Sequence, residues 1–204
     1  MNSYQEIINE IKNSQKEIFK VNFTDNKEIV LKVCDSSDET ISLLTKWRTE
    51  YGEWFDTKFL PTPEKTRKWI EEKILQEKQR ILFLIFYDNQ KIGHLGLDLF
   101  RPEDNSIFIC DVMRGERGFA PGLMVVVFKQ FIKWLQNELK ISIIRLRVFH
   151  DDEKAISLYK KCGLKKSQSI PMKKEITEEG WKWIEQENDN KVAERFFQVM
   201  EIKK

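Results

Sequence analysis

The feature that most constrains the fold is a sharp bend between two apolar segments. In VMRGERGFAPGLMVVVFKQF, residues 112–131, a strand-like segment precedes the bend and an almost uniformly apolar segment follows it. Gly118, Ala120 and Gly122 have little or no side chain, and Pro121 is typical of the first turn of a helix. The pattern therefore predicts a strand that enters a buried helix through a tight corner.

Such a corner is suited to bind phosphate. The first N–H groups of a helix have no partner within the helix, and they lie at the positive end of its dipole. Small residues let a diphosphate approach the backbone, and Arg114 and Arg117 add positive charge. Neither GxxxxGK[ST] nor GxGxxG is present. The alternative is an ordinary strand–helix corner whose glycines only relieve strain.

The remaining pattern predicts one mixed α/β domain over residues 1–204, with an N-terminal helical extension (about 1–25) and a C-terminal insertion (about 171–194). Apolar periodicity indicates the helices, and alternation with short polar turns indicates an antiparallel arrangement of strands. Helices are expected at 3–17, 36–48, 61–78, 123–139 and 151–163, and strands at 17–23, 28–34, 80–87, 91–100, 106–113, 141–149 and 194–202. Residues 178–194 are interpreted as an inserted helix or flap.

Composition excludes several classes of function. Lys+Arg is 35 and Asp+Glu is 33, whereas a nucleic-acid-binding protein is usually strongly basic. The three cysteines, Cys34, Cys110 and Cys162, have no paired spacing, which argues against a disulfide framework or a zinc site. No segment approaches the ~20 apolar residues of a membrane span, and the N-terminus has no apolar signal core. We therefore expect a cytoplasmic protein with no metal, nucleic-acid or membrane partner.

Two landmarks resemble the GNAT acetyltransferase superfamily. Val112, Arg117, Ala120 and Gly122 match its acetyl-CoA signature, V-x-x-x-x-[QR]-x-x-[GA]-x-[GA]. Further along, VFHDDEKAISLYKKCGLKK resembles the strand end and helix that form the family's second landmark. The resemblance covers roughly residues 28–168 and the final strand.

The resemblance implies the GNAT acyl-CoA N-acyltransferase fold, a mixed and mainly antiparallel sheet flanked by helices, with two strands splayed apart at its middle. It also implies acetyl-CoA as co-substrate and direct attack by an amine in a ternary complex, with no covalent enzyme intermediate. By the same resemblance, the residues expected to contact acetyl-CoA are Val112, Arg117, Gly118, Phe119, Ala120, Gly122, Leu123 and Asp152. Asp152 stands where the family usually has Asn, and an ionised carboxylate cannot donate a hydrogen bond.

The resemblance assigns Tyr159 as the acid that protonates the departing thiolate, although a tyrosine on an amphipathic helix is often a core residue. The base is a choice between His94, which can also be a half-buried structural histidine, and Asp111. Strand alternation puts Asp111 on the opposite face from Cys110 and Val112 unless a bulge intervenes. Cys110 is interpreted as a small core residue, since direct transfer needs no nucleophile.

The acceptor is expected to lie against KWRTEYGEWFDTKFLPTPEKT, residues 46–66, which also contains Glu53 and Asp56. Arg48, Trp54 and Phe59 are the predicted substrate-binding residues, because aromatic and charged side chains suit a ring-shaped amine with a phosphate or carboxylate. TPEKTRKWI, RILFLI, KIGHLGL and PGLM are similar to GNAT members of bacterial surface-sugar pathways, which implies a nucleotide-linked amino sugar. The alternatives are a protein N-terminal or lysine acetyltransferase and a non-catalytic CoA-binding module. We expect a monomer or homodimer.

Overall fold

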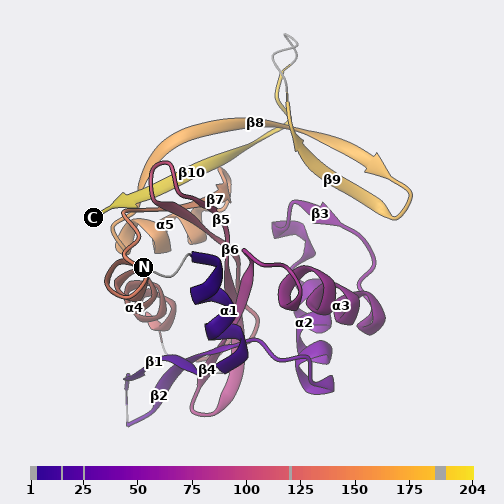
Figure 1. Cartoon of the computed structure of the whole chain (residues 1–204). Coiled ribbons are helices and arrows are strands. Elements are labelled where there is room, and N and C mark those ends of the chain that lie inside the picture. The colour runs from indigo at the N-terminus through magenta and orange to yellow at the C-terminus, as the bar shows by residue number, and fades with distance from the viewer. Residues whose placement is uncertain (1–3, 15, 25, 120, 187–191) are drawn as a thin grey trace.

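The fold is a strongly curved mixed sheet with helices on both faces (Figure 1). The structure is a computed structural model, and it describes residues 4–14, 16–24, 26–119, 121–186 and 192–204. Within these residues the strands form one ten-stranded sheet in the order β1-β2-β4-β5-β6-β7-β10-β8-β9-β3. Neighbouring strands are antiparallel except β6 and β7, which are parallel. The predicted mixed, mainly antiparallel fold is confirmed.

The elements follow the expected order, with additions near residue 57 and after residue 164. The helices are α1 (Tyr4–Ser14), α2 (Asp38–Glu50), the 3₁₀ turn η1 (Gly52–Trp54), α3 (Pro63–Trp69) with its π-helical continuation η2 (Ile70–Leu75), α4 (Leu123–Asn137) and α5 (Glu153–Lys161). The strands are β1 (Glu17–Asn22), β2 (Glu28–Val33), β3 (Thr57–Lys58), β4 (Ile81–Tyr87), β5 (Gln90–Arg101), β6 (Ser106–Arg114), β7 (Ile143–Phe149), β8 (Lys165–Thr177), β9 (Gly180–Glu185) and β10 (Arg195–Lys203).

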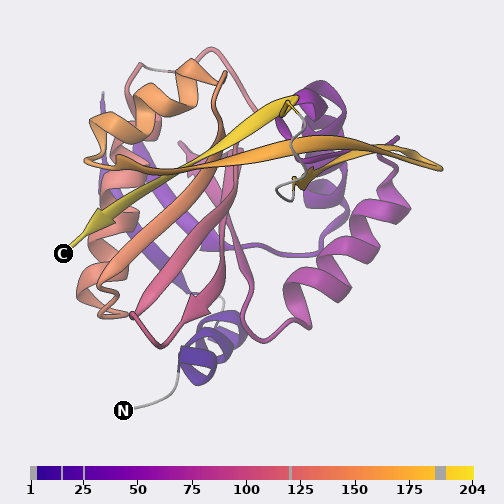
Figure 2. The ribbon, with the colours of Figure 1, turned by 90° about the horizontal axis from the view of Figure 1, so that it is seen from above.

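The two faces of the sheet bury separate apolar clusters. Helices α4 and α5 cover one face, and α2 with α3 covers the other (Figures 1 and 2). The α4 face buries Phe83, Phe128 and Phe131 completely, which explains why α4 is apolar on nearly every side. The α2 face is centred on Trp47, which is also fully buried. The sheet is therefore a rigid middle layer between two packed cores.

Local signals set the ends of the helices around the site. The Ser37 side chain caps α2 by accepting from the Thr40 N–H, and the Thr62 hydroxyl caps α3 in the same way. Asp152 caps α5, and its carboxylate accepts from the Ala155 N–H at 3.0 Å. These caps fix where α2, α3 and α5 begin.

The central parallel pair of strands separates halfway along its length. Strands β6 and β7 pair only from Ser106–Ile109 against Ile143–Leu146. Beyond Cys110 and Arg147 the two strands have no shared ladder, and β7 continues along β10 instead. The expected splay at the middle of the sheet is thus present, between the strands that carry the two landmark sequences.

A β-bulge in β6 lies at the point of separation. His94 of β5 pairs with Met113 and Gly96 pairs with Cys110, so Asp111 and Val112 together oppose the single residue Leu95. Asp111 has the left-handed backbone angle φ 49° that such a bulge permits. The bulge breaks the simple alternation that would have put Asp111 on the far face.

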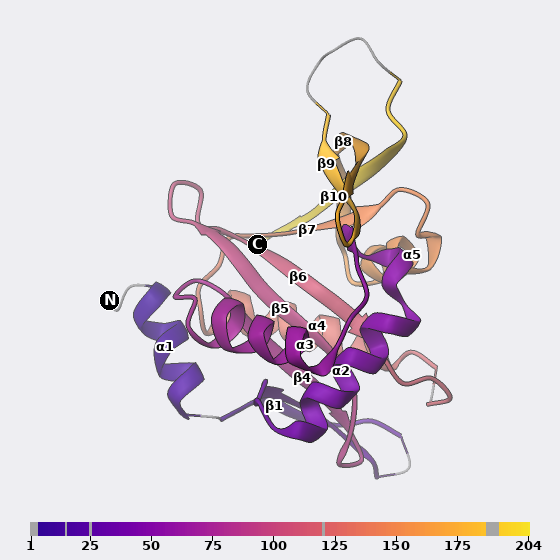
Figure 3. The ribbon, with the colours of Figure 1, turned by 90° about the vertical axis from the view of Figure 1, so that its right-hand side faces the viewer.

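The C-terminal region forms a strand hairpin, so of the two expectations, an inserted helix or a flap, the helix is wrong. Strands β8 and β9 pair with each other, and β9 also pairs with β3 through Trp181 and Lys182. The hairpin extends the sheet across the top of the molecule in Figure 1 and reaches the side where α2 and α3 lie (Figures 1 and 3). Part of the predicted insertion, residues 187–191, lies outside the described residues.

The predicted N-terminal helix is present as α1 and packs against the domain. Ile8 is fully buried, and the Tyr4 ring stacks on Phe100 at 4.4 Å between centroids. Among the described residues, no helix combines the length and the apolar character needed to cross a bilayer.

Candidate active site

A cleft of about 390 Å³ occupies the gap between β6 and β7. We call it the central cleft; residues 108–113 of β6 and 146–149 of β7 form its sides, and Asp152, Ala155 and Tyr159 of the α5 region close one end. Because the two strands no longer pair there, the cleft borders strand backbone that has no partner strand across the gap. A narrow slot of this kind accepts a linear, flexible group such as a thioester arm.

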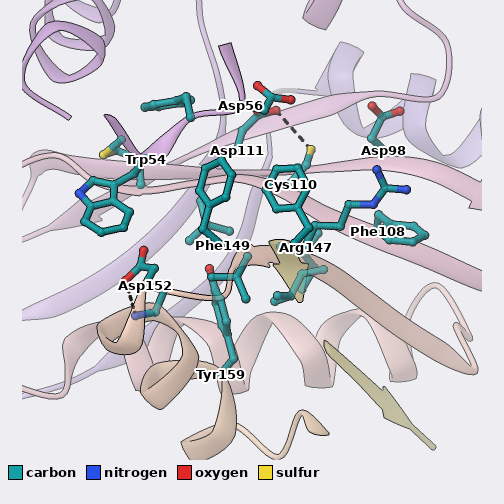
Figure 4. A pocket seen from close by; sticks show the side chains of 18 of the residues that line it. Trp54, Asp56, Asp98, Phe108, Cys110, Asp111, Arg147, Phe149, Asp152 and Tyr159 are labelled. Carbon is teal, nitrogen blue, oxygen red and sulfur yellow. Dashed lines mark hydrogen bonds between the residues drawn. The ribbon is translucent and has the colours of Figure 1, made fainter. Parts of the chain in front are cut away.

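Tyr159 projects from α5 into the central cleft (Figure 4). Its ring packs against Phe128 at 5.1 Å between centroids and is almost completely buried. No hydrogen bond joins its hydroxyl to any residue that the structure describes. Burial, followed by the charge of Asp152, raises the pKa of this hydroxyl above its ordinary value, so it stays protonated at neutral pH. A buried, protonated hydroxyl facing the gap can donate a proton there.

A second cavity of about 350 Å³ lies on the α2–α3 side of the sheet. We call it the side pocket; its lining includes Arg48, Phe59, Lys65, Trp69 and His94. Four residues line both cavities: Phe55, Asp56, Arg80 and Asp111. We call these four the junction. Figure 4 shows Asp56 and Asp111 on the side of the central cleft opposite Tyr159.

The bulge places Asp111 at the junction, where its carboxylate forms an ion pair. Arg80 Nη2 donates to Asp111 Oδ2 at 2.7 Å, and the Cys110 thiol donates to the same oxygen at 3.2 Å. Burial and the neighbouring Asp111 charge raise the pKa of Cys110, so this thiol is a poor nucleophile. The sequence-predicted base candidate Asp111 is therefore close to the cleft, with its charge balanced by a guanidinium.

His94 is buried in the wall of the side pocket. Its Nδ1 lies 2.6 Å from the carbonyl oxygen of Asp111, and its ring stacks on Trp47 at 6.0 Å between centroids. Burial lowers the pKa of His94 to about 4, so the imidazole is neutral at pH 7. A neutral imidazole whose Nδ1 contacts a carbonyl oxygen donates from that nitrogen. The bond holds the bulge in place.

The predicted substrate-binding residues line two different cavities. Arg48 and Phe59 both line the side pocket, where the Arg48 guanidinium stacks on Phe55 at 3.6 Å and on Phe59 at 5.1 Å. Its only hydrogen bond to a described residue goes to the Thr57 carbonyl oxygen. Burial lowers the pKa of Arg48 to about 10, and the group remains charged at pH 7. Trp54 instead borders the central cleft, and it is 48% exposed.

The bend after β6 has the geometry expected of an anion cradle. Gly118 and Gly122 have φ values of 90° and 83°, and open space surrounds the position of a Cβ at each. Leu123 starts α4, so its N–H and that of Met124 lie in the first helical turn. Ala120, the remaining small residue of the predicted signature, lies outside the described residues. The described part of the bend fits the diphosphate of a CoA ester.

The side chains of Phe119, Leu123 and Arg114 support the bend through contacts within the protein. The Phe119 ring packs on Tyr87 at 5.4 Å between centroids, and the Leu123 side chain is fully buried. Only the main chain of these two predicted residues can therefore face a cofactor. Arg114 donates to the carbonyl oxygens of Glu116 and Phe119.

The other predicted cofactor residues occupy the rim and the cleft. The Arg117 guanidinium stacks on Tyr51 at 4.8 Å, next to the bend. Val112 lines the central cleft directly after the bulge. Asp152 also lines the cleft, where its carboxylate serves as the α5 cap. An acceptor-only side chain fits that capping role, but it does not supply the hydrogen-bond donor that Asn would offer to a cofactor.

Sequence reasoning did not single out Phe55 or two charged residues of the junction, Arg80 and Asp56. Arg80 precedes β4, and only its placement against the β6 bulge brings it to Asp111. Asp56 belongs to the predicted acceptor segment, but nothing local distinguishes it from Glu53. The pairing of β3 with β9 is what fixes this part of the chain beside the cleft.

The comparisons with known proteins agree with this geometry. A family profile described as an acetyltransferase (GNAT) domain matches residues 29–165. The chain belongs to the GNAT acetyltransferase family, and it is an acetyl-CoA-dependent N-acetyltransferase.

One relative is the acetyltransferase PseH of Campylobacter jejuni subsp. jejuni, which is 26% identical over 125 residues, or 60% of this chain and 75% of that protein. A similar solved structure is the ribosomal L7/L12 α-N-protein acetyltransferase RimL in complex with coenzyme A, with a TM-score of 0.67, 13% identity and coverage of 92% of this chain and 98% of that one. Another is the spermidine N-acetyltransferase of Vibrio cholerae in complex with CoA and spermine, with a TM-score of 0.67, 11% identity and coverage of 86% and 95%.

Proposed function

We propose that this enzyme acetylates the primary amine of a small acceptor that also carries a phosphate or carboxylate, such as a nucleotide-linked amino sugar. The observation that carries this proposal is the side pocket. It shares the junction with the central cleft and contains a half-buried guanidinium that contacts the faces of two aromatic rings. The resemblance of TPEKTRKWI, RILFLI, KIGHLGL and PGLM to GNAT members of bacterial surface-sugar pathways supports a small-molecule acceptor of this class.

Arg48 is the proposed anchor of the anionic group. Its guanidinium lines the cavity, forms an ion pair with none of the described carboxylates, and keeps its charge at pH 7. A planar guanidinium binds phosphate and carboxylate with two parallel hydrogen bonds. The aromatic rings of Phe55 and Phe59 restrict its rotation, which reduces the entropy lost on binding.

The central cleft is the proposed route of the acetyl donor. Its diphosphate would lie against the N–H groups of the bend, and its thioester would reach between β6 and β7 toward Tyr159. Tyr159 then donates its proton to the departing sulfur. The side pocket brings the amine to the junction from the opposite side of the sheet, so that both substrates meet at Asp56 and Asp111.

A panel of acceptors tests the proposal, with release of free CoA thiol as the readout. The panel contains UDP-glucosamine, glucosamine 6-phosphate, spermidine and a peptide with a free N-terminal serine. We expect the anionic amino sugars to react with the highest kcat/KM. Arg48→Met should lower kcat/KM for them by roughly ten- to a hundred-fold, which corresponds to about 1.4–3 kcal/mol, the value of a charge-assisted hydrogen bond. A preference for spermidine or for the peptide would contradict the proposed acceptor class.

A protein N-terminal acetyltransferase is the second candidate, and the extent of the similarity to RimL favours it. A peptide substrate needs an open groove. Here the β8–β9 hairpin lies beside the junction, because Trp183 N–H donates to the Asp56 carbonyl oxygen at 2.6 Å. This closed side favours a small acceptor.

A further inference from the structure

The junction contains two carboxylates with different partners. Asp111 is bonded to Arg80 at 2.7 Å, so its charge is balanced. Asp56 forms an ion pair with none of the residues that the structure describes, and its side chain is exposed at the meeting point of the two cavities. Its Oδ1 accepts from the Thr57 hydroxyl at 3.2 Å. The Asp56 charge also interacts with Arg48, but the two form no salt bridge. Asp56 is thus the junction carboxylate whose oxygens are less occupied by partners and can bind a ligand.

The position of Asp56 is fixed by its backbone. Its carbonyl oxygen accepts from Trp183 N–H, and Thr57, the next residue, pairs with Lys182 in the edge of the sheet. These bonds do not involve the carboxylate. A carboxylate presented by anchored main chain can hold one orientation while its oxygens remain available.

We infer that Asp56 is a catalytic residue, which binds the ammonium group of the acceptor and takes the proton that the nitrogen loses during acetyl transfer. This inference rests on the proposed function, since it needs an amine acceptor in the side pocket. The charged groups that line this pocket around Asp56 are Arg48, Lys65, Arg80 and Asp111, with His94 as the neutral titratable group. Lys65 is paired with Glu179 at 2.8 Å.

The other two candidates are less suited to this role. His94 is neutral and buried, so it offers no negative charge to attract an ammonium ion. The Asp111 carboxylate already accepts from Arg80 and from the Cys110 thiol. Protonating Asp111 would leave the Arg80 guanidinium without its ion-pair partner. Of the three groups, Asp56 is the exposed carboxylate that has no ion-pair partner among the described residues.

In the proposed reaction Asp56 accepts protons from the nitrogen and Tyr159 donates one to the sulfur, so that atoms and charge balance. The acceptor arrives as an ammonium ion and releases one proton to solvent through Asp56. The neutral nitrogen then bonds to the carbonyl carbon, the carbon–sulfur bond breaks, and its electron pair leaves with sulfur. As the new bond forms, the N–H becomes strongly acidic, so a carboxylate can accept its proton. Sulfur takes a proton from Tyr159, and solvent restores both side chains, with one net proton released.

The test compares Asp56→Asn, Asp56→Glu and the control Glu53→Gln, using whichever of UDP-glucosamine, glucosamine 6-phosphate and spermidine the wild-type enzyme acetylates fastest. Glu53 lies on the same segment, 69% exposed, and is paired with Lys58 outside both described cavity linings. We expect Asp56→Asn to lower kcat/KM by at least roughly a hundred-fold at pH 7. The loss should shrink at least ten-fold by pH 9, where more of the amine is already neutral. Asp56→Glu should recover part of the activity, and Glu53→Gln should match wild type.

Two further readouts separate a chemical role from a structural one. The thermal shift caused by acetyl-CoA should be the same in Asp56→Asn and wild type, because the diphosphate is proposed to bind the bend, whose described contacts do not involve Asp56. Activity of Asp56→Asn within two-fold of wild type, a loss that does not depend on pH, or a lost acetyl-CoA shift would overturn the inference. Wild-type enzyme that binds acetyl-CoA but acetylates none of the three probes would overturn the proposed function, and this inference with it.

Discussion

Replacing Tyr159 by Phe tests the chemistry of the central cleft most directly. The substitution removes one hydroxyl and leaves the ring packed on Phe128. Since no described residue bonds to that hydroxyl, its loss should change the free energy of unfolding by less than about 1 kcal/mol. For a chain of this size that limit corresponds to a change in Tm below about 4 °C.

The effect on turnover should be much larger. Without a proton donor, the thiolate must leave unprotonated, and turnover should fall by roughly ten-fold to 10⁴-fold. This range corresponds to about 1.4–5.5 kcal/mol of lost transition-state stabilisation. Because burial raises the pKa of Tyr159 above its ordinary value of 10.0, the wild-type enzyme should lose no activity through this group as the pH rises from 7 to 9.

The assay measures release of free CoA thiol at saturating acetyl-CoA, beside a thermal melt of each variant. Tyr87→Phe is the matched control, because it removes the same group from a buried tyrosine whose hydroxyl hydrogen-bonds, among the described residues, to Thr24 alone, at 3.5 Å. Turnover of Tyr159→Phe within two-fold of wild type would refute the assignment of Tyr159 as the acid.

Two predictions concern stability. The unfolded chain protonates His94 near its ordinary pKa of 6.5, whereas the folded chain does so only near 4, so the folded state loses stability as the pH falls from 6.5 to 4. Denaturant titrations should show wild type losing about 2 kcal/mol more than His94→Gln between pH 7 and pH 5, and equal losses would contradict the burial of a neutral imidazole. A Cβ at Gly115 would lie 2.0 Å from the Trp47 ring, so Gly115→Ala should destabilise by about 1–3 kcal/mol or more in the same titration. Gly52→Ala, with nothing within 4 Å of the new carbon, is the control, and an equal effect of both would show that the ring moves freely.

The parts of the fold that follow from local pattern were predictable. A segment that is apolar on almost every side predicts the buried helix α4. Apolar segments joined by short polar turns predict the β4–β5–β6 meander. These two features depend on residues close together in the chain. The splay between β6 and β7 was expected only from the resemblance to the family, because the two strands lie far apart in the sequence.

The long strand β8 was missed for a physical reason. Only Ile170 and Met172 are buried along it, so the alternation of apolar and polar residues is too short to recognise. Pro171 lies between them, and proline within an apolar run argues against a strand. Pairing with β10 and β9 on its two sides supplies what the local sequence lacks.

The details of the junction depend on contacts between distant segments. The bulge that turns Asp111 toward the cleft exists because of its register against β5, which alternation within β6 cannot reveal. The same holds for Arg80, whose role appears only when the start of β4 lies against that bulge. The sequence could therefore name Asp111 as a candidate and could not orient it.

The pairing of β3 with β9 affects the order in which parts of the chain can fold during synthesis. Thr57 and Lys58 emerge from the ribosome well before Trp181 and Lys182. Contacts between such distant segments form slowly, and domains assemble as the chain appears. Most of the α4 core precedes β8 in the chain, but Met200 of β10 belongs to the same core. Phe197 of β10 also lines the central cleft, so the acceptor side and the thioester side of the site should both be completed late, when β8, β9 and β10 join the sheet.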